Sequence, residues 1–143
     1  MIHLPHCLDG TMPLDWPIYR YWSTVIEGLK NLGIDFLSTT TLANRMRNAG
    51  FTNVTERVFN VPMGTWPRNK VLKMVGLYWR TVLLDGTYPI AIAPLTRGLK
   101  YTKEDVEMFI IDVRKAYMDL SVHSYMPFYI IYGQRPELDM GRY

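Results

Sequence analysis

Apolar residues recur at helical spacing in the first third of the chain. Asp15 precedes the first such pattern, and Pro17 stands in its first turn, where the missing N–H of a proline does little harm. Gly33 follows the pattern as a natural helix end. A shorter helical pattern begins near Thr41 and ends at Gly50. We therefore predict two helices, the first with the apolar positions Ile18, Trp22, Val25, Ile26 and Leu29.

Two later segments have the composition of β-strands. Residues 51–61 (FTNVTERVFNV) are rich in β-branched and aromatic side chains, alternating at first and then apolar on both faces. Residues 125–133 (YMPFYIIYG) are apolar throughout, as expected for a strand buried on both sides. Pro127 must lie near the start of that strand or at a bulge. We predict one strand over each segment and a loose tail after Pro136.

About sixty residues separate the two predicted strands, and their pattern is mainly helical. One helix is predicted from about Asn69 to Leu84, where Gly86 ends it. Residues 88–99 are apolar and contain two prolines, which fits either a short helix or a tight loop. Thr102 and Asp105 form a capping-box-like start for the next helix. The predicted apolar stripes are Leu72, Val75, Trp79, Val82 and Leu83 on the first helix, and Val106, Ile110, Val113, Tyr117 and Leu120 on the second.

These elements predict an α+β fold with four to five helices packed on a small antiparallel sheet. We expect one domain over residues 1–143, with an irregular N-terminal segment at 1–13 and a helical insertion at 62–122. Two apolar strands alone are marginally stable, and an open apolar edge must be covered. We therefore predict a homodimer, most simply two-fold, that pairs strands or exchanges helices across its interface.

Composition and charge narrow the classes of function. Apolar residues make up 48% of the chain and charged residues 20%, as in ordinary globular proteins. The net charge of +3 is dispersed, whereas a nucleic-acid surface needs a concentrated basic stripe. Cys7 is the only cysteine, which excludes an intrachain disulfide and a thiolate metal site. The sequence has neither a signal peptide nor an apolar run long enough to span a membrane. We expect a soluble, cytoplasmic protein.

Five short motifs occur in a fixed order and cover nearly the whole chain. They are DGT with a Trp-rich helix after it (Asp9, Gly10, Thr11 and 15–32), a strand start (Ala49, Gly50, Phe51, Val54), a P-x-G-x-W-P turn (Pro62, Gly64, Trp66, Pro67), a helix start (Tyr101, Thr102, Glu104, Val106) and a closing pattern (His123, Tyr125, Pro127, Tyr129, Tyr132, Gly133, Arg135, Pro136). In these motifs the chain resembles the C-terminal half of class I, S-adenosylmethionine-dependent methyltransferases of the LaeA-like kind, which belong to fungal secondary metabolism. The resemblance implies that the two predicted strands are the last two of the sheet and pair antiparallel. It also implies that the insertion covers a substrate pocket.

The cofactor-binding half of such an enzyme is missing from the pattern. A class I methyltransferase holds its cofactor with a glycine-rich loop after the first strand and an acidic residue after the second. The ten glycines of this chain form no G-x-G-x-G after an apolar strand. We therefore expect no cofactor, and no binding of S-adenosylmethionine by this chain alone. Three explanations stay open: a fragment of a longer product, a partner that completes or regulates another methyltransferase, and a stand-alone protein reused for different chemistry.

The histidines are the candidate acid–base groups. His123 stands between the last predicted helix and the last strand, where it could act as general acid or base. The competing interpretation is a helix-end histidine that bonds free carbonyls. His6 or His3, with Asp9, could form a His–Asp pair beside the methyl-acceptor site that the resemblance implies, unless this N-terminal segment is simply solvated. The H-x-x-H spacing of the two N-terminal histidines has no third ligand in view, so we expect no metal site.

The candidate substrate-binding residues are mostly aromatic, because aromatic side chains line pockets for flat organic ligands. Arg97 lies in an apolar stretch and would need a partner, either Asp85 or a ligand oxygen. For each aromatic residue, ordinary core packing is the competing interpretation. The predicted set is Tyr19, Trp22, Trp66, Trp79, Tyr88 and Arg97.

Three functions are compatible with these features. The one that the sequence favours is a cofactor-independent cyclase or isomerase that acts on an apolar, polyketide-like small molecule, because a shaped and dry pocket can orient a substrate without a cofactor. The second is a methyltransferase subunit or fragment that is active only with a cofactor-binding partner. The third is a non-catalytic binding protein or regulator of secondary metabolism.

Overall fold

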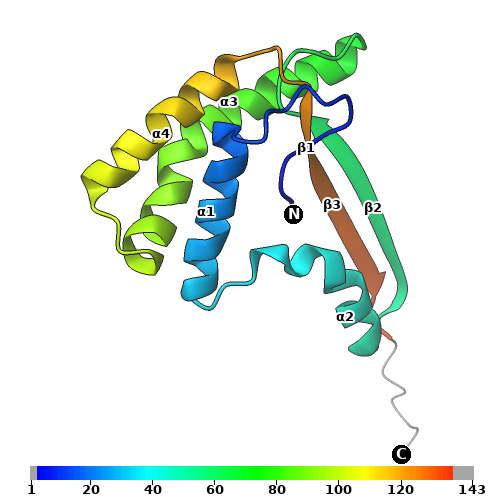
Figure 1. Ribbon diagram of the computed structural model, residues 1–143. Coiled ribbons are helices and arrows are strands. Elements are labelled where there is room, and N and C mark those ends of the chain that lie inside the picture. Colours follow the sequence, from blue (N-terminus) through cyan, green and yellow to red (C-terminus); the bar gives the residue numbers. More distant parts are fainter. Residues whose placement is uncertain (1–2, 137–143) are drawn as a thin grey trace, which may run out of the picture.

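The computed structural model describes residues 3–136, and the predicted loose tail after Pro136 lies outside them. Three long helices form one layer and a long two-stranded ribbon stands beside it, joined at its far end by a short helix (Figure 1). The predicted α+β class is confirmed. In chain order the elements are β1 (His6–Cys7), α1 (Pro17–Asn31), the 3-10 helix η1 (Phe36–Thr41), α2 (Leu42–Asn48), β2 (Thr52–Pro62), α3 (Lys70–Ala93), the π-helical turn η2 (Pro94–Gly98), α4 (Lys103–Met118) and β3 (Ser124–Gln134).

The sheet is antiparallel throughout, with the strand order β1-β3-β2. β2 and β3 pair over nearly their full length, with Phe59 opposite Phe128. β1 is only two residues long and pairs with the start of β3, where Cys7 is opposite Ser124. The N-terminal segment was predicted to be irregular. This prediction is wrong for His6 and Cys7, because their pairing fixes them against β3. The carbonyl of Pro127 accepts a further bond from the amide of His3 at 3.1 Å.

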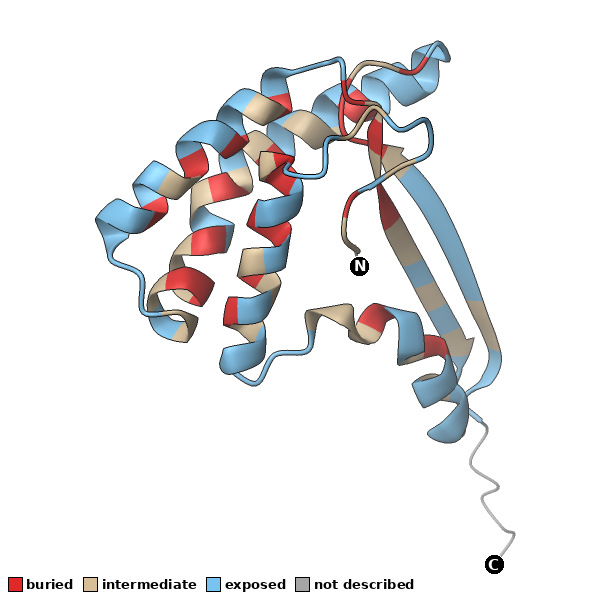
Figure 2. Ribbon diagram, in the orientation of Figure 1, coloured by how far each residue is buried: buried red, intermediate tan, exposed pale blue. Residues whose placement is uncertain are grey.

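The main core lies between α1, α3 and α4, where buried positions concentrate (Figure 2). α1 approaches η2 so closely that a Cβ on Gly28 would overlap the carbonyl of Pro94. The predicted stripe of α4 is buried at Val106, Ile110, Val113 and Tyr117, whereas Leu120 lies beyond the end of the helix and is exposed. Thr102 and Asp105 form the predicted capping box.

The predicted end of the third helix at Gly86 is wrong, because α3 continues through Gly86 and Pro89 to Ala93. A proline inside a helix costs one backbone bond and some crowding, and tertiary packing offsets that cost here. Thr87 and Ala91 are buried beyond Gly86. The segment after them is therefore neither a separate short helix nor a simple loop, but the end of a long helix followed by η2.

Burial along the strands and the first half of α3 also differs from the prediction. β3 is buried on both faces only near its start, and Ile130 and Tyr132 are 44% and 49% exposed. On α3 Leu72, Val75 and Val82 are exposed, and of the predicted stripe only Leu83 is fully buried. The reason is architectural: the ribbon stands apart from the helical layer over most of its length (Figure 1), so its apolar side chains have few covering elements.

Candidate functional site

The pairing of β1 with β3 brings together two residues that are far apart in the sequence. Asp9 follows β1 by two residues, and His123 immediately precedes β3. Because Cys7 is opposite Ser124 in the register, the side chains of Asp9 and His123 meet at the end of the sheet. Nδ1 of His123 lies 2.6 Å from Oδ2 of Asp9, a charge-assisted hydrogen bond. The two side chains are 40% and 45% exposed, so the pair is accessible from solvent.

Asp9 is held by several donors besides His123. Its Oδ1 accepts bonds from the amide of Thr11 at 3.1 Å, from the Thr11 hydroxyl at 2.8 Å and from the Cys7 thiol at 3.0 Å. Thr11 also accepts a bond from the backbone amide of His123 at 2.8 Å, so the loop and the start of β3 are tied together twice. These bonds, led by those from Cys7 and Thr11, hold the pKa of the Asp9 carboxyl well below its usual range. Asp9 is therefore ionised at neutral pH.

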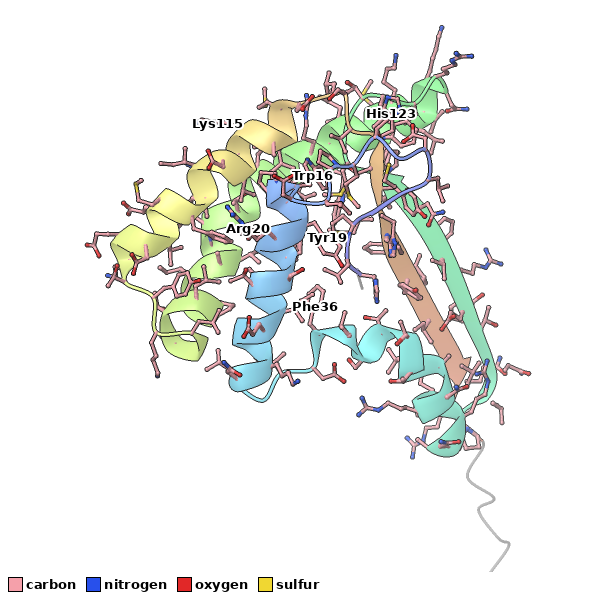
Figure 3. All side chains as sticks on the ribbon, in the orientation of Figure 1. Trp16, Tyr19, Arg20, Phe36, Lys115 and His123 are labelled. Carbon is pink, nitrogen blue, oxygen red and sulfur yellow. The ribbon has the colours of Figure 1, made fainter. Side chains whose placement is uncertain are left out.

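Trp66 fixes the orientation of the His123 ring. The indole stacks on the imidazole with a centroid distance of 5.3 Å and an interplanar angle of 28°. The indole nitrogen donates to the carbonyl of Ser124 at 3.0 Å, which anchors the stack to β3. With Nδ1 turned to Asp9, Nε2 is the nitrogen left to exchange a proton with another molecule. Figure 3 places His123 at the end of the ribbon nearest the helical layer.

The structure assigns the predicted acid–base residues differently from the sequence. His6 does not pair with Asp9; its ring stacks on Tyr125 and on His3, each with a centroid distance of 5.8 Å. The partner of Asp9 is His123, which bonds a carboxylate rather than the free carbonyls of a helix end. The physical reason is the strand register, which sequence spacing does not reveal.

The predicted substrate-binding residues do not gather in one pocket. Trp22 is 2% exposed and belongs to the core, where it stacks on Phe36. Trp79 packs edge-on against Phe128. Tyr88 lines a cleft between α3 and α4. Tyr19 points away from Arg20 on α1 (Figure 3) and is exposed.

Arg97 is exposed to solvent as well, so it needs no carboxylate or ligand oxygen. The apolar stretch around it suggested burial, but η2 turns its side chain outward while Leu95 is buried. Of the predicted set, Trp66 alone touches the His123–Asp9 pair.

An apolar groove that the sequence did not predict leads to Trp66, the residue that stacks on His123. Its larger part, about 570 Å³, lies between α3 and the ribbon. A second part of about 370 Å³ shares Asn60, Pro62 and Leu72 with the first and reaches Trp66. The remaining apolar lining residues include Val58, Val61, Val75, Phe128 and Ile130 on the larger part, and Leu8, Pro67 and Tyr125 on the smaller. The signal available in the sequence is the double-sided apolar pattern of the strands, which predicts burial on both faces but here lines an open groove.

The described residues do not fit S-adenosylmethionine in the manner of a class I methyltransferase. That site needs a parallel strand followed by a glycine-rich loop and a helix. The sheet formed within residues 3–136 is wholly antiparallel. Gly10, Gly33 and Gly50 have positive φ, but each stands alone in a turn or at a helix end. That this chain alone does not bind the cofactor stays a prediction.

Among residues 3–136 no group of three or more His, Cys, Asp or Glu side chains could hold a metal ion. No helix in this range is both long and apolar enough to cross a membrane.

The similar proteins are named as methyltransferases and as regulators of secondary metabolism. The chain is 29% identical over 128 residues to the probable methyltransferase tdiE of Emericella nidulans, covering 90% of this chain and 40% of that protein. It is 26% identical over 135 residues to the methyltransferase pytC of Aspergillus terreus, covering 94% and 42%. It is 25% identical over 134 residues to the secondary metabolism regulator LAE1 of Cochliobolus heterostrophus, covering 93% and 44%. No family model and no solved structure matches the chain.

The chain therefore spans less than half the length of these curated relatives. The resemblance inferred from the five motifs is confirmed: over nearly its whole length this chain is similar to LaeA-like fungal methyltransferases, and it corresponds to a part of them.

Proposed function

We propose that the chain is the part of a LaeA-like methyltransferase that binds the methyl acceptor. The part that binds the cofactor would lie on another polypeptide or elsewhere in a longer chain, and the two parts would act together. The observation that carries the proposal is the His123–Asp9 pair, whose imidazole stacks on Trp66, and Trp66 lines the apolar groove. The similarity to methyltransferases supports it, since it covers 90% of this chain and 40% of the relative tdiE. S-Adenosylmethionine would supply the methyl group from that other part.

The residues of this chain then have separate roles. Nε2 of His123 takes a proton from the acceptor, a step for which a positioned base contributes about 10²–10⁴-fold to the rate. The Asp9 carboxylate holds Nδ1–H and stabilises the imidazolium that forms. Trp66 keeps the ring in place through the stack and its anchor on Ser124. The groove binds the apolar body of the acceptor and excludes water from one side.

The first test separates this part from a complete enzyme. In isothermal calorimetry the isolated chain should show no micromolar binding of S-adenosylmethionine. Tagged and expressed in a fungal host, it should purify with a protein that binds S-adenosylmethionine, and the complex should transfer labelled methyl groups. Micromolar binding by the isolated chain would overturn the proposal, because the cofactor part would then lie within it.

The second test addresses the acid–base pair. His123→Ala should lower methyl transfer by the purified complex by about 10²-fold or more, without loss of the partner. His6→Ala is the matched control, because His6 is also a histidine at the same end of the sheet but does not contact Asp9. Equal activity of the two variants would remove His123 from the mechanism.

The second candidate is a cofactor-independent cyclase or isomerase acting on an apolar, polyketide-like intermediate. The observation that favours it is again the His123–Asp9 pair, which can move a proton without any cofactor. The isolated chain would convert a candidate intermediate to a product of unchanged mass, and His123→Ala would abolish the conversion. A product heavier by one methyl group, formed only with the partner, would instead support the first proposal.

The third candidate, a regulator of secondary metabolism, is favoured by the name of the relative LAE1. A regulator would change the set of secondary metabolites in a host that expresses the chain. The same change in a host expressing His123→Ala would separate a regulatory role from the two catalytic ones. The predicted homodimer stays a prediction.

A further inference from the structure

The first half of α3 presents large apolar side chains to solvent. Figure 1 shows this half reaching past the end of α4 toward the ribbon, and Figure 2 shows it largely exposed. Val71 is 70% exposed, Tyr78 65% and Val82 57%. The side chain of Met74 is also 51% exposed. Contiguous apolar surface of this kind on a protein marks an interaction site rather than ordinary scatter.

The exposed residues form a stripe opposite the buried face of the helix. The buried positions of α3 are Gly76, Leu83, Thr87 and Ala91. At 3.6 residues per turn, Val71 and Tyr78 lie about 140–160° around the axis from Gly76. The residue numbers 71, 75, 78 and 82 are spaced by four, three and four, the seam spacing of a coiled coil. We call Val71, Val75, Tyr78 and Val82 the α3 stripe. Val75, which is 39% exposed, lies at its border and also lines the groove between α3 and the ribbon.

We propose that the α3 stripe pairs with the same stripe of a second copy of this chain, the two helices antiparallel about a two-fold axis. With the axis between residues 76 and 77, Val71 meets Val82 of the other copy and Val75 meets Tyr78. A two-fold interface uses the same patch on both subunits, so one apolar stripe suffices. This inference does not rest on the proposed function, and it gives the predicted homodimer an interface other than strand pairing or helix exchange.

The charges along α3 favour the antiparallel orientation. Asp85 is the only acidic residue between Glu56 and Glu104, whereas Lys70 is the first residue of α3 and Arg68 lies just before its N-cap, Asn69. In the antiparallel register Asp85 lies near the basic start of α3 in the other copy, so each end of the pair joins opposite charges. A parallel pair would instead place Lys70 beside Lys70 and Asp85 beside Asp85. The antiparallel pair also brings opposite ends of the two helix dipoles together.

Sedimentation of the full chain tests the interface. The wild-type chain should be a dimer, and Tyr78→Glu should raise the dimer dissociation constant by about tenfold or more, because a carboxylate in an apolar seam has no partner. Met108→Glu on α4 is the matched control: Met108 is 69% exposed but lies off the stripe, so its dimer should be unchanged. Circular dichroism should show that both variants keep the fold.

Disulfide trapping tests the orientation. In a Cys7→Ser background, oxidation of a mixture of Val71→Cys and Val82→Cys chains should give the mixed disulfide dimer, and Val71→Cys chains alone should give almost none. The proposal is overturned if the wild-type chain is monomeric at every concentration, which would leave the stripe for another partner. It is also overturned if Val71→Cys chains cross-link to each other, or if Tyr78→Glu leaves the dimer intact.

Discussion

Tyr21 offers the sharpest test of how the helical layer is held together. Its side chain is 1% exposed, and its hydroxyl donates to the carbonyl of Thr87 on α3 at 2.8 Å. The ring packs edge-on against Trp22 and is stacked with Phe109 of α4. Tyr21→Phe would therefore remove one buried hydrogen bond between α1 and α3 and leave the packing of the ring in place.

The expected cost follows from that single bond. A neutral hydrogen bond inside a protein contributes a net free energy of about 1 kcal/mol. The carbonyl of Thr87 lies within α3 and keeps its own helical bond, so it is not left wholly unpaired. We expect Tyr21→Phe to lower the free energy of unfolding by about 1 kcal/mol, and the midpoint of thermal unfolding by roughly 3–4 °C for a chain of this length.

Urea unfolding followed by circular dichroism measures the change, with Tyr19→Phe as the matched control. Tyr19 lies two residues away on the same helix and is 39% exposed, so its loss of a hydroxyl should alter stability by less than about 0.5 kcal/mol. If Tyr21→Phe were as stable as Tyr19→Phe, the bond to Thr87 would not join the two helices as argued.

Three further predictions concern pH and close packing. Burial raises the pKa of both Tyr21 and Tyr117 above the ordinary value, so their contribution to stability is complete below about pH 10 and is lost as the pH rises above it. Phe variants of the two should therefore flatten the alkaline limb of the stability curve; an unchanged limb would contradict this. The pKa of Asp9 is lowered from 3.8, so its contribution is present above that pH and is lost on acidification. Unfolding titrations of Asp9→Asn should show a shallower acid limb than the wild type, and parallel limbs would count against the hydrogen bonds to Asp9. A Cβ on Gly76 would overlap the carbonyl of Gly64, whereas one on Gly64 meets only ordinary contacts. Gly76→Ala should cost roughly 2 kcal/mol in urea unfolding and Gly64→Ala less than about 1 kcal/mol, and equal costs would refute the close approach of α3 to the turn after β2.

The start of α4 shows where local sequence is sufficient. Thr102 and Asp105 bond each other's backbone amides, and these bonds involve only four consecutive residues. The apolar spacing after them places Val106 and Ile110 on the buried face, as predicted. Because both the cap and the stripe are short-range features, no knowledge of the rest of the chain is needed to find them.

α3 shows where a local rule fails. Gly86 and Pro89 are both unfavourable inside a helix, so sequence alone predicts an end before them. The helix continues because Leu83 and Ala91 are buried on either side of them against the rest of the helical layer. That burial depends on packing against α1 and α4, and the local helix propensity of residues 83–91 does not include this packing.

The candidate site was also predicted from the sequence only in part. Sequence identified His123 and Asp9 as titrating groups, and Trp66 as an aromatic side chain that could serve a site. The predicted partner of Asp9, a histidine of the N-terminal segment, is wrong. His6 is three residues from Asp9 in the sequence, whereas the actual partner, His123, is 114 residues away. The correct partner follows from the register of β1 on β3, which depends on long-range pairing.

The sequence by itself determined the helix starts, the two long strands, the α+β class and the resemblance to LaeA-like methyltransferases, because periodicity, capping and motifs lie within short stretches of chain. Tertiary structure alone decided which apolar faces are covered. It left the α3 stripe and the groove beside Trp66 open, although their residues are as apolar as those of the core. The physical reason is that burial depends on where neighbouring elements pack, and in this chain the ribbon stands away from the helical layer.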